Sequence, residues 1–183
     1  MADLWNHQCS VESLMNQPTY QKETPYSDTK IDPKGIDTLL RQTIAKLSRF
    51  FSIEKASLSH FNPNQNNLHV THIYKRRRWN TGLTLIIQNN NSNMYQVLMQ
   101  GYPVADNYPD HISSNIIERK IILSERTKSV LIIPLMYDCQ KVGLLTLSSE
   151  SEGAFGTYID GLGEGIVAEL TAGLYINQAF NAA

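Results

Sequence analysis

The chain has 183 residues, a length that suits one compact domain with a tail. Its 16 basic and 17 acidic residues leave a net charge of −1, which argues against nucleic acid or an anionic membrane as a partner. Hydrophobic residues make up 42% of the sequence, enough for a sizeable core. The sequence has no run of about 18 apolar residues and no secretory signal pattern. We therefore expect a folded, cytoplasmic protein.

Residues 1–31 are rich in Asn, Gln, Ser, Thr and Pro and bury little surface to offset the entropy of ordering. We expect a partly flexible N-terminal arm there, which forms either a short amphipathic helix between Leu4 and Met15 or a frayed terminus. The domain proper is predicted over 32–183. It opens with Asp32 as a helix N-cap, and apolar residues then recur at helical intervals. This pattern predicts a helix over 32–51.

Two hairpins are predicted from apolar runs that flank polar turns. Residues 56–61 and 68–74 surround an Asn-rich turn, which favours left-handed backbone. Residues 129–135 and 141–148 surround the polar turn 137–140. Successive residues of this second pair are apolar, so both faces of the sheet should be covered by other elements.

The segment 79–128 alternates short apolar pieces with Asn- and Pro-containing stretches, so periodicity alone does not separate strand from buried helix. Ser92 is a suitable N-cap and Gly101 a suitable stop for a helix between them. The predicted elements of this segment are a strand over 82–88, a helix over 92–100, an extended piece over 101–106 and a helix over 114–122.

A long closing helix is predicted over 157–180. Thr157 and Asp160 have the spacing of a capping box, and a stripe of aliphatic residues follows. The predicted helix also contains several glycines, each of which costs roughly 0.5–1 kcal/mol relative to alanine. They indicate either close approach of another helix or the sheet, or a bendable helix; they are Gly161, Gly163, Gly165 and Gly173.

Candidate metal ligands are few and poorly arranged. The chain has two cysteines, Cys9 and Cys139, which lie far apart and supply neither a disulfide framework nor the four thiolates of a structural zinc site, so we expect reduced thiols. His60, His69 and His72 lie on the first predicted hairpin. Strand alternation should place His69 and His72 on opposite faces. We therefore expect no metal site.

Short motifs resemble the successive signatures of a GAF domain. A Gly-x-Pro-Val-x-x-Asp-like piece precedes an apolar Ser-x-Leu-x-x-Pro-Leu strand, a Gly-x-Leu-x-Leu strand and a Phe that opens the last helix. In this chain these motifs are Gly101 to Asp106, Ser129 to Leu135, Val142 to Leu147, and Ala154-Phe155. The resemblance covers roughly residues 32–180. It implies an α+β fold like those of profilin and PAS domains, with a central antiparallel sheet, the N- and C-terminal helices on one face and a variable roof of helices and loops on the other.

The resemblance also implies a non-catalytic sensory or regulatory module that binds a small molecule under the roof. Such domains commonly form homodimers through their terminal helices, here 32–51 and 157–180, and an output domain can follow the last helix. A scaffold that only dimerises is the alternative. The family's chemistry must still be argued from the site, because one fold hosts several functions.

Cysteine usage separates the family's chemistries. Members that attach a bilin covalently use a cysteine in the middle segment, and 79–128 contains none, so no covalent bilin is expected. Members that reduce free methionine sulfoxide need a nucleophilic cysteine with resolving partners. The only cysteine near the domain is Cys139, which makes a thiol enzyme the weaker alternative. The cofactor is unknown.

If the roof lies where the resemblance puts it, aromatic and polar residues of the middle segment should line a ligand pocket. Asp106, His111 and Arg119 are candidates for orienting a polar group of the ligand. Trp79 closes the basic run 75–79, which is either a solvated strand end or a contact for an anionic ligand. The ligand-binding candidates are Trp79, Tyr95, Tyr102, Asp106, Tyr108, His111, Arg119 and Ser129, with Leu131 or Val130 from the sheet.

Overall fold

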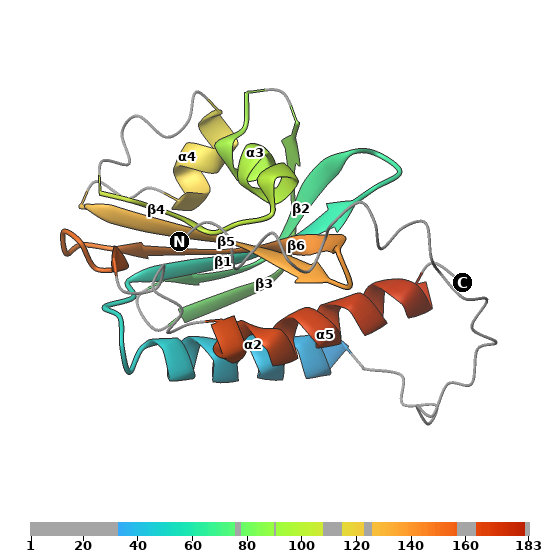
Figure 1. Ribbon diagram of the computed structural model, residues 1–183, viewed down its shortest axis with the longest axis horizontal. Coiled ribbons are helices and arrows are strands. Elements are labelled where there is room, and N and C mark those ends of the chain that lie inside the picture. Colours follow the sequence, from blue (N-terminus) through green and yellow to red (C-terminus); the bar gives the residue numbers. More distant parts are fainter. Residues whose placement is uncertain are drawn as a thin grey trace.

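A computed structural model describes residues 33–75, 78–89, 91–107, 115–122, 126–156 and 164–181. The predicted arm 1–31 and its boundary with the domain lie outside this set. The described part has three layers (Figure 1): a central sheet, two long helices against one face and two short helices against the other. This is the predicted α+β architecture.

The sheet contains six antiparallel strands within the described residues, in the order β3-β2-β1-β6-β5-β4. Both predicted hairpins are confirmed as neighbouring strand pairs, and β3 is longer than the predicted strand 82–88. The strands are β1 Lys55–Asn62, β2 Asn67–Lys75, β3 Arg78–Gln88, β4 Val104–Asp106, β5 Ser129–Tyr137 and β6 Gln140–Ser149.

Helices α2 (Pro33–Leu47) and α5 (Glu164–Asn181) pack side by side under one face of the sheet. They run antiparallel, because Leu39 of α2 lies beside Gly173 while Lys46 pairs with Glu169 one turn earlier in α5. A Cβ at Gly173 would crowd the Leu39 side chain, so this glycine serves the predicted close helix approach. Helix α2 ends before the predicted residue 51, and the predicted start of α5 at 157 lies outside the described residues.

The core between these helices and the sheet explains the apolar stripes in the sequence. Leu40 and Ile44 of α2 and Leu170 and Leu174 of α5 are almost fully buried. They pack against Leu58 and other inward residues of the central strands. Burying a Leu or Ile side chain contributes roughly 1.5–3 kcal/mol.

Helices α3 (Asn93–Gln100) and α4 (Ile116–Ile122) form the roof over the opposite face. The Ser92 side chain accepts the Tyr95 N–H, and Gly101 ends α3 in the left-handed conformation with a φ of 78°. Both predicted caps are confirmed. A second apolar core fills the space beneath the roof, so the sheet is covered on both faces as predicted.

The turn between β5 and β6 corrects the expectation for the cysteines. Asp138 and Cys139 have φ values of 44° and 60°, which fits a two-residue type I′ turn. The structure holds Cys139 in a disulfide bond, so its thiol is not reduced as expected. The other cysteine of the chain, Cys9, lies outside the described residues.

A β-bulge in β2 overturns the expected placement of the histidines. Strand β1 pairs Leu58 with His72 and Ser59 with Val70, which leaves Thr71 as an extra residue. One extra residue reverses the parity of side-chain directions along a strand. His69 and His72 therefore both face α2, and the expectation that they lie on opposite faces is wrong.

Candidate functional site

The structure contains a pocket of about 250 Å³ between α3 and the β4–β5 edge of the sheet. Helix α3 supplies one wall, and the two strands supply the floor. The lining residues are Asn93, Gln96, Val97, Gln100, Val104, Asp106, Val130 and Ile132.

Regular geometry brings these residues together. The α3 members lie three, four and seven positions after Asn93, which places them on one helix face. On the sheet, Val104 lies opposite Ile132, and Asp106 lies opposite Val130. Directly opposed residues of an antiparallel pair point to the same face. The pocket is therefore built from one helix face and one face of a strand pair.

The pocket combines an apolar base with polar groups. Val97, Val130 and Ile132 are buried, while Gln96 and Gln100 are exposed. Amide side chains offer donors and acceptors, and the Asp106 carboxylate offers acceptors. This mixture suits a small ligand that has both an apolar part and hydrogen-bonding groups.

Buried hydroxyl groups continue from the pocket floor across the sheet. Thr146 of β6 lies opposite Ile132 on one side and Ser57 of β1 on the other, and Ser59 follows on the same face. The Ser57, Ser59 and Thr146 hydroxyl oxygens are buried and have no hydrogen-bond partner within the described structure. Such groups carry a desolvation cost of roughly 1–3 kcal/mol each. The sheet face under the roof is therefore more polar than packing alone requires.

Two polar side chains, Glu118 and Lys55, fix α4 in the roof. The Glu118 carboxylate is fully buried and accepts the N–H groups of Asn93, at 3.2 Å, and of Met94 at the start of α3, where the helix dipole favours negative charge. At the other end of α4, Lys55 Nζ donates to the Lys120 carbonyl at 2.7 Å. Burial, followed by repulsion from Lys75, lowers the pKa of Lys55 to about 8.

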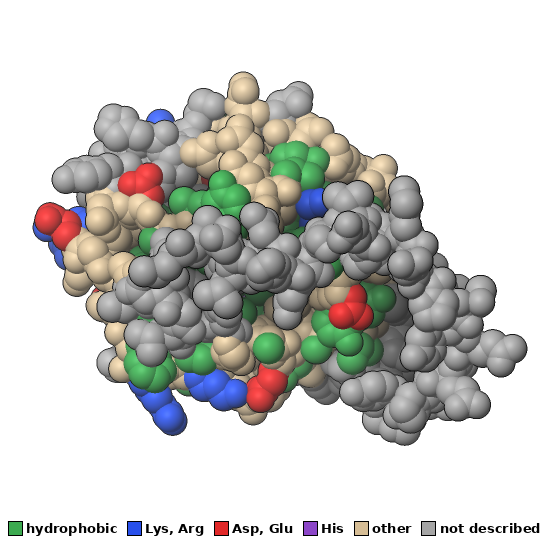
Figure 2. Space-filling view, viewed as in Figure 1, with side chains coloured by type: hydrophobic (Ala, Val, Ile, Leu, Met, Phe, Trp, Pro, Cys, Tyr) green, Lys and Arg blue, Asp and Glu red, His purple; other side chains and the backbone are tan. Residues whose placement is uncertain are grey.

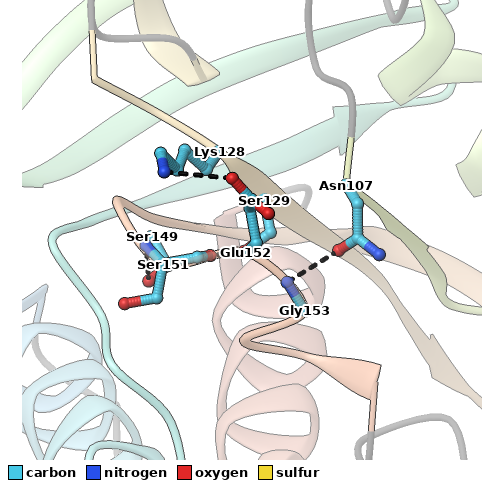
Figure 3. Close-up of polar contacts among 7 residues, drawn as sticks. All are labelled: Asn107, Lys128, Ser129, Ser149, Ser151, Glu152 and Gly153. Atoms are coloured by element: carbon cyan, nitrogen blue, oxygen red, sulfur yellow. Dashed lines mark hydrogen bonds and ion pairs between the residues drawn. The ribbon is translucent and has the colours of Figure 1, made fainter.

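The loop after β6 is tied to the pocket strands (Figure 3). Gly153 N donates to Asn107 Oδ1 at 3.1 Å, and Asn107 directly follows Asp106 at the end of β4. At the start of β5, Ser129 Oγ donates to the Ser151 carbonyl at 2.7 Å. The loop then reaches Phe155, which is buried against Phe51 with 5.8 Å between ring centroids. The pocket edge thus contacts the segment that leads toward α5.

Among the sequence-predicted ligand residues, Asp106 lines the pocket. Tyr95 is directed elsewhere, because its hydroxyl hydrogen-bonds Asn66 Oδ1 at 2.5 Å and its ring lies near Phe61. Tyr102 and Arg119 are exposed. Ser129 is buried and holds the loop after β6. Tyr108 and His111 lie outside the described residues.

Trp79 and Leu131 lie on the opposite side of the sheet from this pocket. Leu131 is buried in the core beneath α2 and α5, and Val130 is the member of that pair that faces the roof. Trp79 packs against the same helix-side core, with its ring 4.9 Å from Tyr74 and 4.9 Å from the Arg41 guanidinium. The structure does not bring these two residues to the pocket.

Sequence reasoning missed the α3 wall and the hydroxyl floor. One helix face can be read from the sequence by its spacing, and this signal could have found the α3 wall. The residues with this spacing are Asn93, Gln96, Val97 and Gln100. No comparable signal marked Ser57, Ser59 and Thr146, because alternating Ser or Thr in a strand is usual on exposed faces.

No group of three or more His, Cys, Asp or Glu side chains in the described part of the chain is arranged to hold a metal ion. None of the described helices is both long and apolar enough to cross a lipid bilayer.

Comparison with known proteins gives a family match. The family model named "GAF domain" matches residues 35–160, which is more than half of the chain. No curated protein matches the sequence.

Several solved structures share the fold at low sequence identity. The GAF domain of a two-component sensor histidine kinase from Bacillus halodurans has a TM-score of 0.65 and 16% identity, covering 79% of this chain and 97% of its own. A GAF domain/HD domain protein from Geobacter sulfurreducens has a TM-score of 0.57 and 13% identity, with coverages of 79% and 95%. A type II free methionine-R-sulfoxide reductase from Thermoplasma acidophilum has a TM-score of 0.52 and 12% identity, with coverages of 76% and 90%. At these identities the likeness concerns the fold alone.

Proposed function

Because the chain belongs to the GAF domain family, whose members are generally regulatory or sensory domains, we propose that it is a non-catalytic sensor of a small molecule. The ligand binds in the pocket between α3 and the β4–β5 edge. The observation that carries this proposal is the pocket itself, which joins a buried aliphatic base to amide and carboxylate groups. Its volume of about 250 Å³ suits a metabolite of modest size.

Ligand binding transmits a signal by favouring one arrangement of the terminal helices. The Asn107–Gly153 hydrogen bond links the pocket strand β4 to the loop that precedes α5. A ligand that shifts Asp106 also shifts the neighbouring Asn107, and through it the loop that holds Phe155 against Phe51. The coupling thus runs through contacts between packed elements.

The α2–α5 layer is the proposed homodimer surface. Phe50, just after α2, is 58% exposed, and a Cβ added at Gly165 of α5 would enter open space. The lower edge of the molecule, where these helices lie, carries a mixture of hydrophobic, basic and acidic side chains (Figure 2). Such a mixture resembles the surface of a reversible interface more than that of a permanent one. An output domain after α5 would receive the signal.

A thermal-shift screen tests the ligand proposal, with nucleotides, amino acids, organic acids and tetrapyrroles as the probes. A true ligand at about 100 times its Kd adds roughly 2.7 kcal/mol to the unfolding free energy. Gln96→Ala and Asp106→Asn should each lower the ligand affinity at least about tenfold, because both residues line the pocket. The stabilisation at a given ligand concentration falls accordingly. Gln42→Ala is the matched control, an exposed glutamine on α2. A ligand that binds both variants with the affinity of the wild type would refute the pocket assignment.

The same screen separates the alternatives. A dimer-only scaffold gives no stabilisation with any probe while it still self-associates. A thiol reductase requires a cysteine at the pocket, and the described pocket lining contains none. Methionine sulfoxide reduction that is abolished by Cys139→Ser would support the enzyme and refute the non-catalytic proposal.

A further inference from the structure

Three imidazoles gather on the sheet face that packs against α2. His60 of β1 lies directly opposite His69 of β2, and the bulge at Thr71 returns His72 to the same face. His72 also contacts the Thr71 hydroxyl through Nδ1 at 2.8 Å. Without the extra residue, His72 would point to the roof. The backbone irregularity therefore creates the cluster.

Helix α2 contributes the charged groups that face this cluster. Asp37 accepts a hydrogen bond from Arg41 Nε at 2.8 Å through Oδ2. Its other oxygen, Oδ1, is buried without a partner in the described structure, and so is Nε2 of His69. Arg41 in turn lies over the Trp79 ring of β3. Among the described residues, the titratable and charged groups on this face near the imidazoles are thus Asp37 and Arg41 from α2 and Tyr74 of β2.

The surroundings favour the neutral form of His60 and His72. Burial, followed by repulsion from His72 and His69, lowers the pKa of His60 from 6.5 to about 4. Burial also lowers the pKa of His72; Asp37 opposes this shift and Arg41 adds to it. Within the described part of the chain, Asp37 is thus the carboxylate that acts on the cluster, through His72, beside the Arg41 guanidinium. Two or three imidazolium charges there would repel one another with too little negative charge to offset them.

We infer that the histidine cluster is an acid-sensitive latch, and that acidification releases the N-terminal half of α2 from the sheet. Between pH 6.5 and about 4 the released form binds more protons than the docked form, so docking weakens as the pH falls. Arg41 and Trp79 move apart in the released form. The Ile36 and Leu39 side chains, which end beside Gly173 of α5, move away from it, so the α2–α5 layer loosens. This device does not depend on the proposed pocket ligand.

Hydrogen exchange and fluorescence of the full chain test the latch. Between pH 7 and pH 5, after correction for the intrinsic exchange rate, amides 36–41 of α2 should lose protection at least about tenfold. Amides 94–98 of α3, on the other face, should change less. In a Trp5→Phe variant Trp79 is the only tryptophan, and its emission should change over the same pH range. Unchanged α2 protection at pH 5 would overturn the inference.

Neutral substitutions identify the titrating groups. When α2 is released, the His60→Gln variant should bind up to about one proton fewer than the wild type. The unfolding free energy of the variant should therefore depend less steeply on pH. His72→Gln, at a less buried site, gives the same readout if His60→Gln does not fold. Ile44→Val is the control, since it destabilises α2 packing without removing a titratable group. A pH dependence that is the same in the wild type and both histidine variants would refute the latch.

Discussion

Gly143 shows how a single residue limits the centre of the sheet. It lies opposite His60 of β1, and a Cβ at this position would collide with the Ser59 backbone carbonyl. Backbone atoms of a central strand have little freedom to move, in contrast to the end of a flexible side chain. The glycine is therefore required by close packing of β1 and β6 and not by an unusual backbone angle.

We predict that Gly143→Ala lowers the unfolding free energy by about 3 kcal/mol, the upper part of the range for overpacked cores. Urea denaturation measures the change. Gly165→Ala serves as the control, because a Cβ at that helical position meets no atom within 4 Å. It should leave stability unchanged or raise it by up to about 1 kcal/mol. Equal effects of the two substitutions would contradict the packing argument.

The histidines also illustrate parity at the residue scale. Alternation along an ideal strand would place His69 and His72 on opposite faces of the sheet. The bulge at Thr71 adds one residue, so the two side chains share one face. Sequence patterns identify a strand well but do not reveal a bulge within it. Side-chain direction also separates Leu131 from Val130. These neighbours on β5 point to opposite faces of the sheet, and Val130 is the one that faces the roof.

At the scale of elements, the roof depends on one buried carboxylate. Glu118 of α4 accepts two N–H groups at the start of α3, so each helix orients the other. Asn115 adds a local cap, since its Oδ1 accepts the N–H groups of Ile117 and Glu118. The short α4 would otherwise have few contacts to hold it over the sheet.

Glu118→Gln should therefore weaken the roof. We expect a loss of about 1–2 kcal/mol in unfolding free energy, because the amide accepts more weakly and carries no charge at the α3 N-terminus. Faster exchange of the Met94 amide should accompany it. Glu169→Gln is the matched control, since Glu169 forms an exposed ion pair with Lys46 and should change stability by less than about 0.5 kcal/mol. Equal losses in both variants would mean that the Glu118 contacts do not hold the roof.

At the scale of the whole molecule, the two faces of the sheet serve different purposes. The roof face carries the pocket and the hydroxyl floor, and the helix face carries the histidine cluster and the proposed dimer surface. The loop after β6 connects them through Asn107 and Phe155. A ligand signal and a pH signal would then meet at the same pair of terminal helices.

The dimer proposal predicts a specific effect of Phe50→Glu. A charge at this exposed position should raise the dimer Kd at least tenfold, about 1.4 kcal/mol, while the monomer keeps its stability. Sedimentation at several protein concentrations measures the equilibrium. Ile116→Glu, an even more exposed apolar position on α4, should leave association unchanged. Loss of association in Ile116→Glu alone would place the interface on the roof.

Local patterns in the sequence by themselves determined which segments form helices and strands. Ser92 and Gly101 bound α3 as predicted, and the apolar runs of β5 and β6 predicted a sheet covered on both faces, because caps and periodicity act within a few residues. Only the tertiary structure decided which side chains meet. The pocket unites a helix face with paired strands, the disulfide removes the Cys139 thiol, and the bulge gathers the histidines. Each of these depends on register and packing between segments distant in sequence, where a shift of one residue turns a side chain to the other face.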